Sequence, residues 1–219
     1  MLLAIDTSAG TSVAVVDRDG GILAERSVAD TMRHAEVIGD MIAECLDASA
    51  TRREALSGVV AGMGPGPFTG LRVGIAAART FAFALGKPLV PVVSHDAIAY
   101  AHYSAAREAG VAASATRPVL VVTDARRREV YWSAYSGADE LGLPVRIDGP
   151  GLSKPDEVPV AAFAETEFDR LDATEISAGA LGMFAELSFA AGRPFAANEA
   201  LYLRSPDVMI SNGPKRVTR

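Results

Sequence analysis

This chain of 219 residues contains a single cysteine, Cys45. One thiol forms no disulfide within the chain and builds no cysteine-based zinc site, so the fold has no cross-link of either kind. Aromatic residues are also few, at 6%, whereas hydrophobic residues make up 49% and charged residues 22%. This composition is typical of an ordinary globular protein, and a chain of this length buries enough surface to fold without cross-links.

Positive charge is in short supply. The 21 lysines and arginines are outnumbered by 27 acidic residues, which gives a formal net charge of −6. Such a balance argues against a broad nucleic-acid-binding surface. Basic residues cluster in two places only, at Arg126-Arg127-Arg128 and at Lys215, Arg216 and Arg219. A local contact with phosphate or RNA stays open at these clusters.

Long hydrophobic runs are missing as well. The longest apolar helix candidate, 71–85, spans about 15 residues and carries Arg72 and Arg79, which makes it too short and too charged to cross a bilayer. The sequence begins on an apolar strand without a basic segment or cleavage site before it. We expect a cytoplasmic protein that does not enter a membrane.

Short apolar runs separated by turn residues fill the first half of the sequence. The runs at 2–6, 12–16 and 22–28 are joined by a polar turn and by Asp19-Gly20, a strong hairpin signal, so they predict three antiparallel strands. Apolar residues at helical spacing then predict helices at 34–47, 71–85 and 94–108, which alternate with strands at 58–62 and 89–93.

The second half is less regular. Its pattern predicts strands at 118–123 and 130–135, helices near 160–163 and 181–191, and a frayed tail from about residue 211. Between 137 and 159, scattered glycines and prolines leave no clear pattern of helix or strand. Strands followed by alternating helices and strands indicate an α/β fold in which helices pack on a mixed sheet. A small polar stretch at 110–116 divides the chain into domains 1–109 and 110–219, and the two halves could be an eroded duplication.

Hydroxyl groups follow a carboxylate at the end of the first predicted strand. Asp6 is succeeded by Thr7, Ser8 and, after a glycine, Thr11. Such a loop could hold a phosphate group through its amides and hydroxyls, with Asp6 facing Mg²⁺ or its water. It could equally be a hairpin turn in which Asp6 accepts hydrogen bonds from turn amides.

The least generic stretch is the loop 64–70, Gly-Pro-Gly-Pro-Phe-Thr-Gly, which precedes the helix at 71–85. Glycines before a helix could present amides to an anion, but the P-loop pattern is missing and Pro65 and Pro67 lack amide donors. A tight turn that lets the helix dock is the alternative. Small residues recur at every fourth position and allow close approach of another backbone, namely Gly70, Gly74, Ala78 and Ala82.

The histidines do not form a metal-binding pair. His95 and His102 are seven residues apart, and His34 lies far from both in sequence. We expect His34 and His95 to cap the helices that begin near them. No nucleophile-elbow spacing surrounds a serine, so hydrolase chemistry is not expected and no catalytic residue is predicted.

Five segments together resemble the TsaB (YeaZ) family. They are 3–8 (Leu-Ala-Ile-Asp-Thr-Ser), 33–36 (Arg-His-Ala-Glu), 64–74 (Gly-Pro-Gly-Pro-Phe-Thr-Gly-Leu-Arg-Val-Gly), 124–131 (Asp-Ala-Arg-Arg-Arg-Glu-Val-Tyr) and 202–204 (Tyr-Leu-Arg). The resemblance is strong to about residue 135 and looser to residue 204. Pro67 is a departure, because the family usually has serine there.

The resemblance implies a two-lobed fold of the actin/Hsp70/sugar-kinase (ASKHA) type, with a reduced second lobe. It also implies a role in making threonylcarbamoyladenosine (t6A) beside the anticodon of tRNAs that read codons starting with A. In that pathway the paralogue TsaD transfers the threonylcarbamoyl group to tRNA, TsaE supplies an ATPase cycle, and TsaB holds TsaD in its working state.

TsaD-type sequences carry a His-x-x-x-His metal motif after the equivalent strand, and here that place has His95 and Ala99. Losing one of so few ligands removes the metal site. The resemblance therefore implies a subunit without a catalytic or metal site, in which Asp6, Thr7, Ser8 and Thr11 form a vestigial phosphate loop. No cofactor is expected, or ATP or ADP only weakly or in a complex.

We expect the helices at 34–47 and 70–85 to bind TsaD, or a second copy of this chain when TsaD is absent, and tRNA to be reached only through the complex. On this hypothesis Ala78→Arg abolishes association and leaves the monomer folded. An ATP-dependent phosphotransferase or ATPase of the sugar-kinase type, using the Asp6 loop, is the alternative. The predicted interface residues are Ile38, Met41, Ile42, Gly70, Gly74, Ala78 and Ala82.

Overall fold

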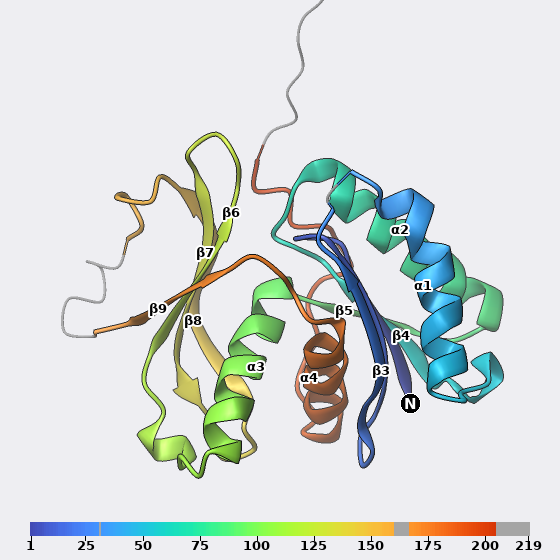
Figure 1. Cartoon of the computed structure of the whole chain (residues 1–219). Coiled ribbons are helices and arrows are strands. Elements are labelled where there is room, and N and C mark those ends of the chain that lie inside the picture. Colours follow the sequence, from blue (N-terminus) through green and yellow to red (C-terminus); the bar gives the residue numbers. More distant parts are fainter. Residues whose placement is uncertain (31, 160–166, 205–219) are drawn as a thin grey trace, which may run out of the picture.

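Two β-sheets stand side by side in the computed structural model, which describes residues 1–30, 32–159 and 167–204 (Figure 1). The first sheet has the order β3-β2-β1-β4-β5 and the second the order β8-β7-β6-β9. The first contains β1 (Leu2–Asp6), β2 (Thr11–Asp17), β3 (Gly21–Val28), β4 (Gly58–Gly62) and β5 (Leu89–Val92). The second contains β6 (Val119–Asp124), β7 (Val130–Ala138), β8 (Pro144–Ser153) and β9 (Asp169–Ala173).

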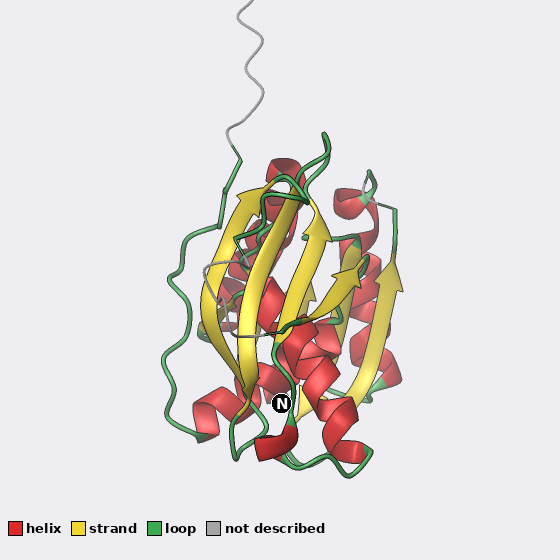
Figure 2. Ribbon diagram, turned by 90° about the vertical axis from the view of Figure 1, so that its left-hand side faces the viewer, coloured by secondary structure: helices red, strands yellow, loops and turns green. Residues whose placement is uncertain are grey.

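Both sheets follow one topology. In each, three antiparallel strands are followed by a strand that pairs in parallel with the first of them, β4 with β1 and β9 with β6. A shared topology of this kind is what a duplicated unit produces. Figure 2, viewed from the side of the second sheet, shows the twist of the strands.

The helices separate and cover the sheets. α1 (His34–Ala48) and α2 (Phe68–Leu85) pack on the outer face of the first sheet. α3 (Ser94–Glu108) and α4 (Ala178–Ala190) lie between the two sheets and contact each other (Figure 1). Short 3₁₀ turns at Arg53–Ala55 and Ala113–Ala115 complete the described elements.

The central strands of the first sheet are buried on both faces. Along β1, Leu2 and Ala4 face the layer of α3 and α4, whereas Leu3 and Ile5 face α1 and α2. Because both faces are covered, these strands read as continuous apolar runs without alternation. The outer side of the second sheet packs a smaller cluster, in which Trp132 is one of six buried members.

The first half of the chain confirms the predicted elements with small shifts. α2 begins at Phe68, three residues before the predicted start, and ends at Leu85, followed by the C-cap residue Gly86, whose left-handed backbone (φ 61°) suits glycine. α3 begins at Ser94, and the N-cap residue before it, Val93, makes no side-chain cap hydrogen bond.

The second half departs further from the sequence-based prediction. β8 and β9 were not predicted, whereas the helix expected at 181–191 is present as α4. β8 is an edge strand with glycines and prolines in its sequence, so the apolar signal of a strand is weak. The helix expected at 160–163 and the tail from 211 lie outside the described residues.

The C-terminal part of the described chain returns to the first sheet. α4 packs against β1 and β2, the amide of Ala196 donates to Pro91 O (3.2 Å), and the amide of Leu201 donates to Met63 O (2.8 Å). The division at 109/110 therefore separates the two sheets but not the two lobes, since the first lobe is completed by residues from the end of the described chain.

Candidate functional site

The predicted phosphate loop is a buried polar cluster at the end of β1. The Asp6 carboxylate accepts hydrogen bonds from the Ser8 amide (2.7 Å) and from Ser94 Oγ at the start of α3 (2.5 Å). Ser8 Oγ lies 2.8 Å from Ser94 Oγ, and Ser94 Oγ also accepts from the Gly64 amide (3.1 Å). The cluster joins β1, the loop after β4 and the start of α3.

Thr7 binds α2 instead of pointing into open space. Its Oγ1 donates to Gly70 O (2.7 Å) and accepts from the Gly74 amide (3.1 Å). A Cβ at Gly74 would lie 2.2 Å from Thr7 Oγ1, so only glycine permits this approach. The small residues at the start of α2 thus serve docking within this chain.

Thr11 pairs with a histidine of α1. Its Oγ1 lies 2.7 Å from Nδ1 of His34, which is buried and whose pKa is lowered, first by burial. The prediction that His34 caps α1 is wrong, because Arg33 is the N-cap residue and no side chain bonds there. The imidazole connects the helix to β2.

The structure brings the four predicted cofactor residues together, yet their side chains are occupied. Asp6, Thr7, Ser8 and Thr11 are each at most 6% exposed, and each bonds another part of the chain. Burial raises the pKa of the Asp6 carboxyl, against hydrogen bonds from Ser94 and Ser8 that lower it. These four side chains therefore form buried hydrogen bonds that link separate segments of the chain.

A loop closes over this cluster from the side of the second sheet. Gly66 packs so closely on Ser8 that an added Cβ would lie 2.8 Å from Ser8 Cα. Tyr131 Oη of β7 donates to Gly66 O (3.3 Å), which holds the loop against the second sheet. Beside it is a hollow of about 290 Å³ whose lining includes Ser8, Ala9, Ala29, Pro67, Asp124, Arg126, Ala173, Thr174 and Glu175.

The predicted interface residues lie in the core of this chain. Ala78 is fully buried, and Ile38, Met41, Ile42 and Ala82 are at most 8% exposed. They pack between the two outer helices and the first sheet, and Gly70 and Gly74 are buried against Thr7. The prediction that these side chains contact a partner is therefore corrected, because the sheet of this chain already covers them.

His95, at the position of the first histidine of the metal motif, contacts the second sheet instead of a metal ligand partner. His95 is fully buried, with Nδ1 2.9 Å from Ser133 Oγ and Nε2 2.9 Å from Thr123 Oγ1. Burial lowers the pKa of His95 to about 3, so the ring is neutral at pH 7. The prediction that His95 caps α3 is wrong, since both ring nitrogens face the second sheet.

Ala99, where the metal motif has its second histidine, is also buried. Within residues 1–30, 32–159 and 167–204, no group of three or more histidine, cysteine, aspartate or glutamate residues could hold a metal ion.

A second polar contact between the lobes was not predicted from the sequence. Tyr135 Oη donates to Asp96 Oδ1 (2.7 Å), and Arg146 Nε lies 3.6 Å from the same oxygen. Burial raises the pKa of Asp96, while Arg146 and Tyr135 act in the opposite direction. No sequence signal marks this cluster, because its members come from α3, β7 and β8.

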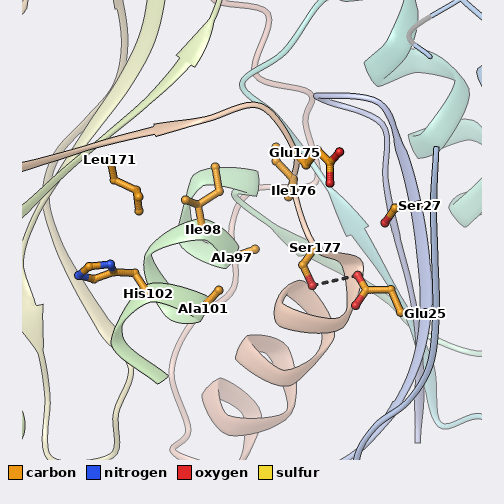
Figure 3. A pocket seen from close by; sticks show the side chains of 10 residues that line it. All are labelled: Glu25, Ser27, Ala97, Ile98, Ala101, His102, Leu171, Glu175, Ile176 and Ser177. Atoms are coloured by element: carbon orange, nitrogen blue, oxygen red, sulfur yellow. Dashed lines mark hydrogen bonds between the residues drawn. The ribbon is translucent and has the colours of Figure 1, made fainter. Parts of the chain in front are cut away.

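A wider hollow of about 440 Å³ lies between α3, β9 and β3 (Figure 3). Glu25 accepts hydrogen bonds from Ser177 Oγ (2.9 Å) and from the Gly179 amide (3.1 Å), so its carboxylate holds the start of α4. The lining includes Glu25, Ser27, Ala97, Ile98, Ala101, His102, Leu171, Glu175, Ile176 and Ser177.

α2 is longer than the sequence predicted and is apolar enough to cross a bilayer by length and composition alone. The core helix of a soluble protein can have the same length and composition. Six residues of α2 are buried on the first sheet, whereas Arg72 and Arg79 are exposed, which is the pattern of a helix at the surface of a core.

Comparisons with known proteins agree with these observations. The family model of TsaD, tRNA N6-adenosine threonylcarbamoyltransferase, matches residues 7–150. An uncharacterized protein of Mycobacterium leprae is 42% identical over 163 residues, which cover 72% of this chain and 40% of that protein. The tRNA threonylcarbamoyladenosine biosynthesis protein TsaB of Escherichia coli is 32% identical over 157 residues, covering 72% of this chain and 64% of TsaB.

The aligned part thus spans 40–64% of the length of these two relatives. Among solved structures, YeaZ from Pseudomonas aeruginosa superposes with a TM-score of 0.72 at 26% identity and covers 91% of this chain and 99% of that one. With the two mixed sheets and their flanking helices, this match confirms the predicted ASKHA-like α/β fold. The chain therefore belongs to the TsaD family of that model and, within it, to the TsaB (YeaZ) branch.

Proposed function

We propose that this protein is a non-catalytic subunit of the machinery that transfers a threonylcarbamoyl group to the adenosine beside the anticodon of tRNAs reading codons that start with A. Its partner in this role is the catalytic subunit TsaD, which it binds and supports. Membership of the TsaB branch supports the proposal, since the related Escherichia coli protein is named for the biosynthesis of threonylcarbamoyladenosine.

The contact between His95 and the second sheet is the observation that carries the non-catalytic role. At the position where TsaD-type sequences have a metal-binding pair, Ala99 has no ligand atom and His95 uses both nitrogens on Thr123 and Ser133. The carboxylate oxygens of Asp6 likewise accept hydrogen bonds from Ser8 and Ser94 of this chain. These groups hold the lobes together, and we propose that no cofactor is needed by this chain alone.

The outward faces of α1 and α2 are the surface that we propose for TsaD, and for a second copy of this chain when TsaD is absent. Because the small-residue face of α2 is buried on the sheet, a partner meets the opposite side, where Phe83 is 87% exposed. The exposed acidic residues of α1 give that surface its polar border, namely Glu36, Asp40, Glu44 and Asp47. We place the complex, with TsaE and tRNA, in the cytoplasm.

Reconstitution tests the proposal directly. Purified TsaD, TsaE, the threonylcarbamoyl-AMP synthase, tRNA, threonine, bicarbonate and ATP are combined with and without this protein, and the modified nucleoside is counted. We expect product only when this protein is present. Equal product without it would overturn the subunit role.

Two further measurements separate the parts of the proposal. Calorimetry of the isolated chain with ATP and Mg²⁺ is expected to show no binding, and turnover of ATP by the chain alone would favour the kinase-like alternative. Phe83→Asp is expected to weaken the association with TsaD without lowering the melting temperature, because the side chain is exposed.

A further inference from the structure

The tip of the β6–β7 hairpin carries three consecutive arginines. Arg126, Arg127 and Arg128 are all exposed, and Arg204 of the C-terminal segment reaches the same tip. We refer to these four residues as the arginine patch. The hairpin tip and the end of the described chain lie at the same end of the molecule in Figure 1.

The backbone of this turn is unusual for its sequence. Arg126, Arg127 and Arg128 have φ values of 64°, 53° and 63°, in the left-handed region that glycine and asparagine adopt at low cost. Three bulky residues in succession there cost free energy that a glycine-containing turn would avoid. Local structure therefore does not explain why arginine occupies these positions, and strain of this kind accumulates at functional sites.

The patch is held firmly in place. The guanidinium of Arg204 donates to Ala125 O (2.7 Å) and lies 3.2 Å from Glu129, while the Arg126 amide donates to Asp124 Oδ1 (2.8 Å). Ala125 is itself buried. The arginines thus extend from a fixed support, which lowers the entropy lost when a ligand binds.

The charge of the patch is opposite to that of the protein. The described residues of this tip carry four guanidinium groups and two carboxylates, Asp124 and Glu129, whereas the formal net charge of the whole chain is −6. Guanidinium groups match phosphate oxygens in a bidentate manner. A phosphate-rich polymer is the partner that this concentration of arginine fits best.

An aromatic surface adjoins the patch along the chain. Tyr202, two residues before Arg204, is 41% exposed, and its ring lies 4.8 Å from that of Phe68. Arg72 stacks over the other ring at 3.8 Å from its centre. An exposed aromatic ring beside arginines is typical of surfaces on which nucleic-acid bases stack.

We propose that the arginine patch binds the phosphate backbone of RNA, with Tyr202 offering a ring on which a base stacks. The inference deepens the proposed function and rests on it only in taking the RNA to be tRNA. It goes beyond the expectation that tRNA is reached only through the complex, because this chain would make its own contact with the RNA.

The test uses the full chain and a fluorescent, unmodified transcript of a tRNA that reads a codon starting with A, with binding followed by anisotropy over a range of salt concentrations. The main variant combines Arg126→Asn, Arg127→Gly and Arg128→Asn. We expect affinity to fall at least about tenfold, and the slope of log K against log salt to become shallower by about 2–3, since each lost phosphate contact removes about 0.7–0.9.

The substitutions suit the left-handed backbone, so the melting temperature should not fall, and weaker binding cannot then be attributed to unfolding. Arg52→Glu with Arg53→Glu is the matched control, because these residues are exposed and lie elsewhere on the surface. Tyr202→Ala should weaken binding with an unchanged salt slope, as stacking releases no counterions. An unchanged affinity in Tyr202→Ala would overturn the stacking role.

Binding by the main variant with unchanged affinity and salt slope would overturn the proposal. Intact tRNA binding together with lost TsaD binding would also overturn it, in favour of an acidic protein partner. The result of the RNA-binding experiment does not depend on the result of the reconstitution. Weakened tRNA binding would support the patch even if reconstitution shows this chain to be dispensable, and an unaffected variant in a working reconstitution would remove the patch alone.

Discussion

The two sheets share a topology but use the turn after their first strand in opposite ways. β1 ends at Asp6, which is 2% exposed and bonded to Ser94, whereas β6 ends at Asp124, whose side chain is 67% exposed. In the first sheet the following residues are hydroxyls turned inward, and in the second they are arginines turned outward. The difference follows from what packs on each turn.

The loop 64–67 and the start of α3 cover the first turn, so every polar atom there needs a partner within the chain. The second turn has the hollow beside it and solvent around it. Equivalent positions in two related sheets can therefore form buried hydrogen bonds in one sheet and an exposed binding surface in the other. Which of the two they form depends on whether other segments bury the turn.

A charge placed in the packed layer of the first sheet should lower the stability of the protein most. Ala78→Arg inserts a guanidinium into a site with no exposure, between α2 and the sheet. We expect the free energy of unfolding to fall by about 4 kcal/mol or more, because an unpaired buried charge and overpacking act together. Urea unfolding measures the change.

Ala76→Arg, on the exposed side of the same helix, is the control and should change stability by less than about 0.5 kcal/mol. A folded and stable Ala78→Arg protein that has lost only its partner would restore the original interface hypothesis.

The junction between the lobes is the next target. His95→Ala leaves Ser133 and Thr123 without their histidine partner and opens a cavity, so we expect a loss of about 2–4 kcal/mol. His102→Ala, on the exposed side of α3, serves as the matched substitution and should have little effect. If thermal unfolding shows equal losses for both, His95 does not hold the lobes together.

The buried carboxyl of Asp6 predicts a pH dependence. Because burial raises its pKa in the folded state above the ordinary value of 3.8, the folded protein binds this proton more tightly than the unfolded chain. The corresponding stability is present below the ordinary value and is lost as the pH rises through the folded value. Asparagine does not titrate, so the cost of Asp6→Asn should shrink as the pH rises.

The measurement is the difference in unfolding free energy between Asp6→Asn and the unsubstituted protein, taken from about pH 4 to about pH 8. The difference between the two proteins cancels the other titrating groups. Asp124→Asn, at the equivalent strand end but exposed, controls for the substitution itself. A cost that grows with pH would contradict the assigned burial effect.

Replacing one arginine in the left-handed turn after β6 should give a small gain in stability. Arg127→Gly relieves a left-handed residue (φ 53°) and should raise stability by about 0.5–1 kcal/mol. Arg52→Gly, at an ordinary φ of −74°, should lower stability slightly, because glycine adds freedom to the unfolded chain. The melting temperatures of the two variants measure these changes. A lower melting temperature in both variants would mean that the turn stores no strain.

Sequence analysis worked best where burial is continuous. The strands at 2–6 and 58–62 were predicted because both of their faces are covered, so apolar residues and glycine fill every position except Asp6. β8 and β9 were not predicted because both are edge strands whose residues are mostly exposed or half-buried, which weakens the apolar signal. The stripe of small residues in α2 was found in the sequence, but we predicted that a partner protein packs against it. In the structure Thr7 of this chain packs against Gly74, and the sequence pattern cannot distinguish the two cases.

The order of the elements in the first half, the α/β class and, through its motifs, the family could be predicted from the sequence alone. The tertiary structure alone decided which polar groups are used up inside. Asp6 with Ser94, Thr11 with His34 and His95 with Ser133 are pairs separated by 23 to 88 residues. Local patterns report hydrophobic periodicity along a chain, whereas the partner of a buried polar group is chosen by packing between distant segments, which no local pattern records.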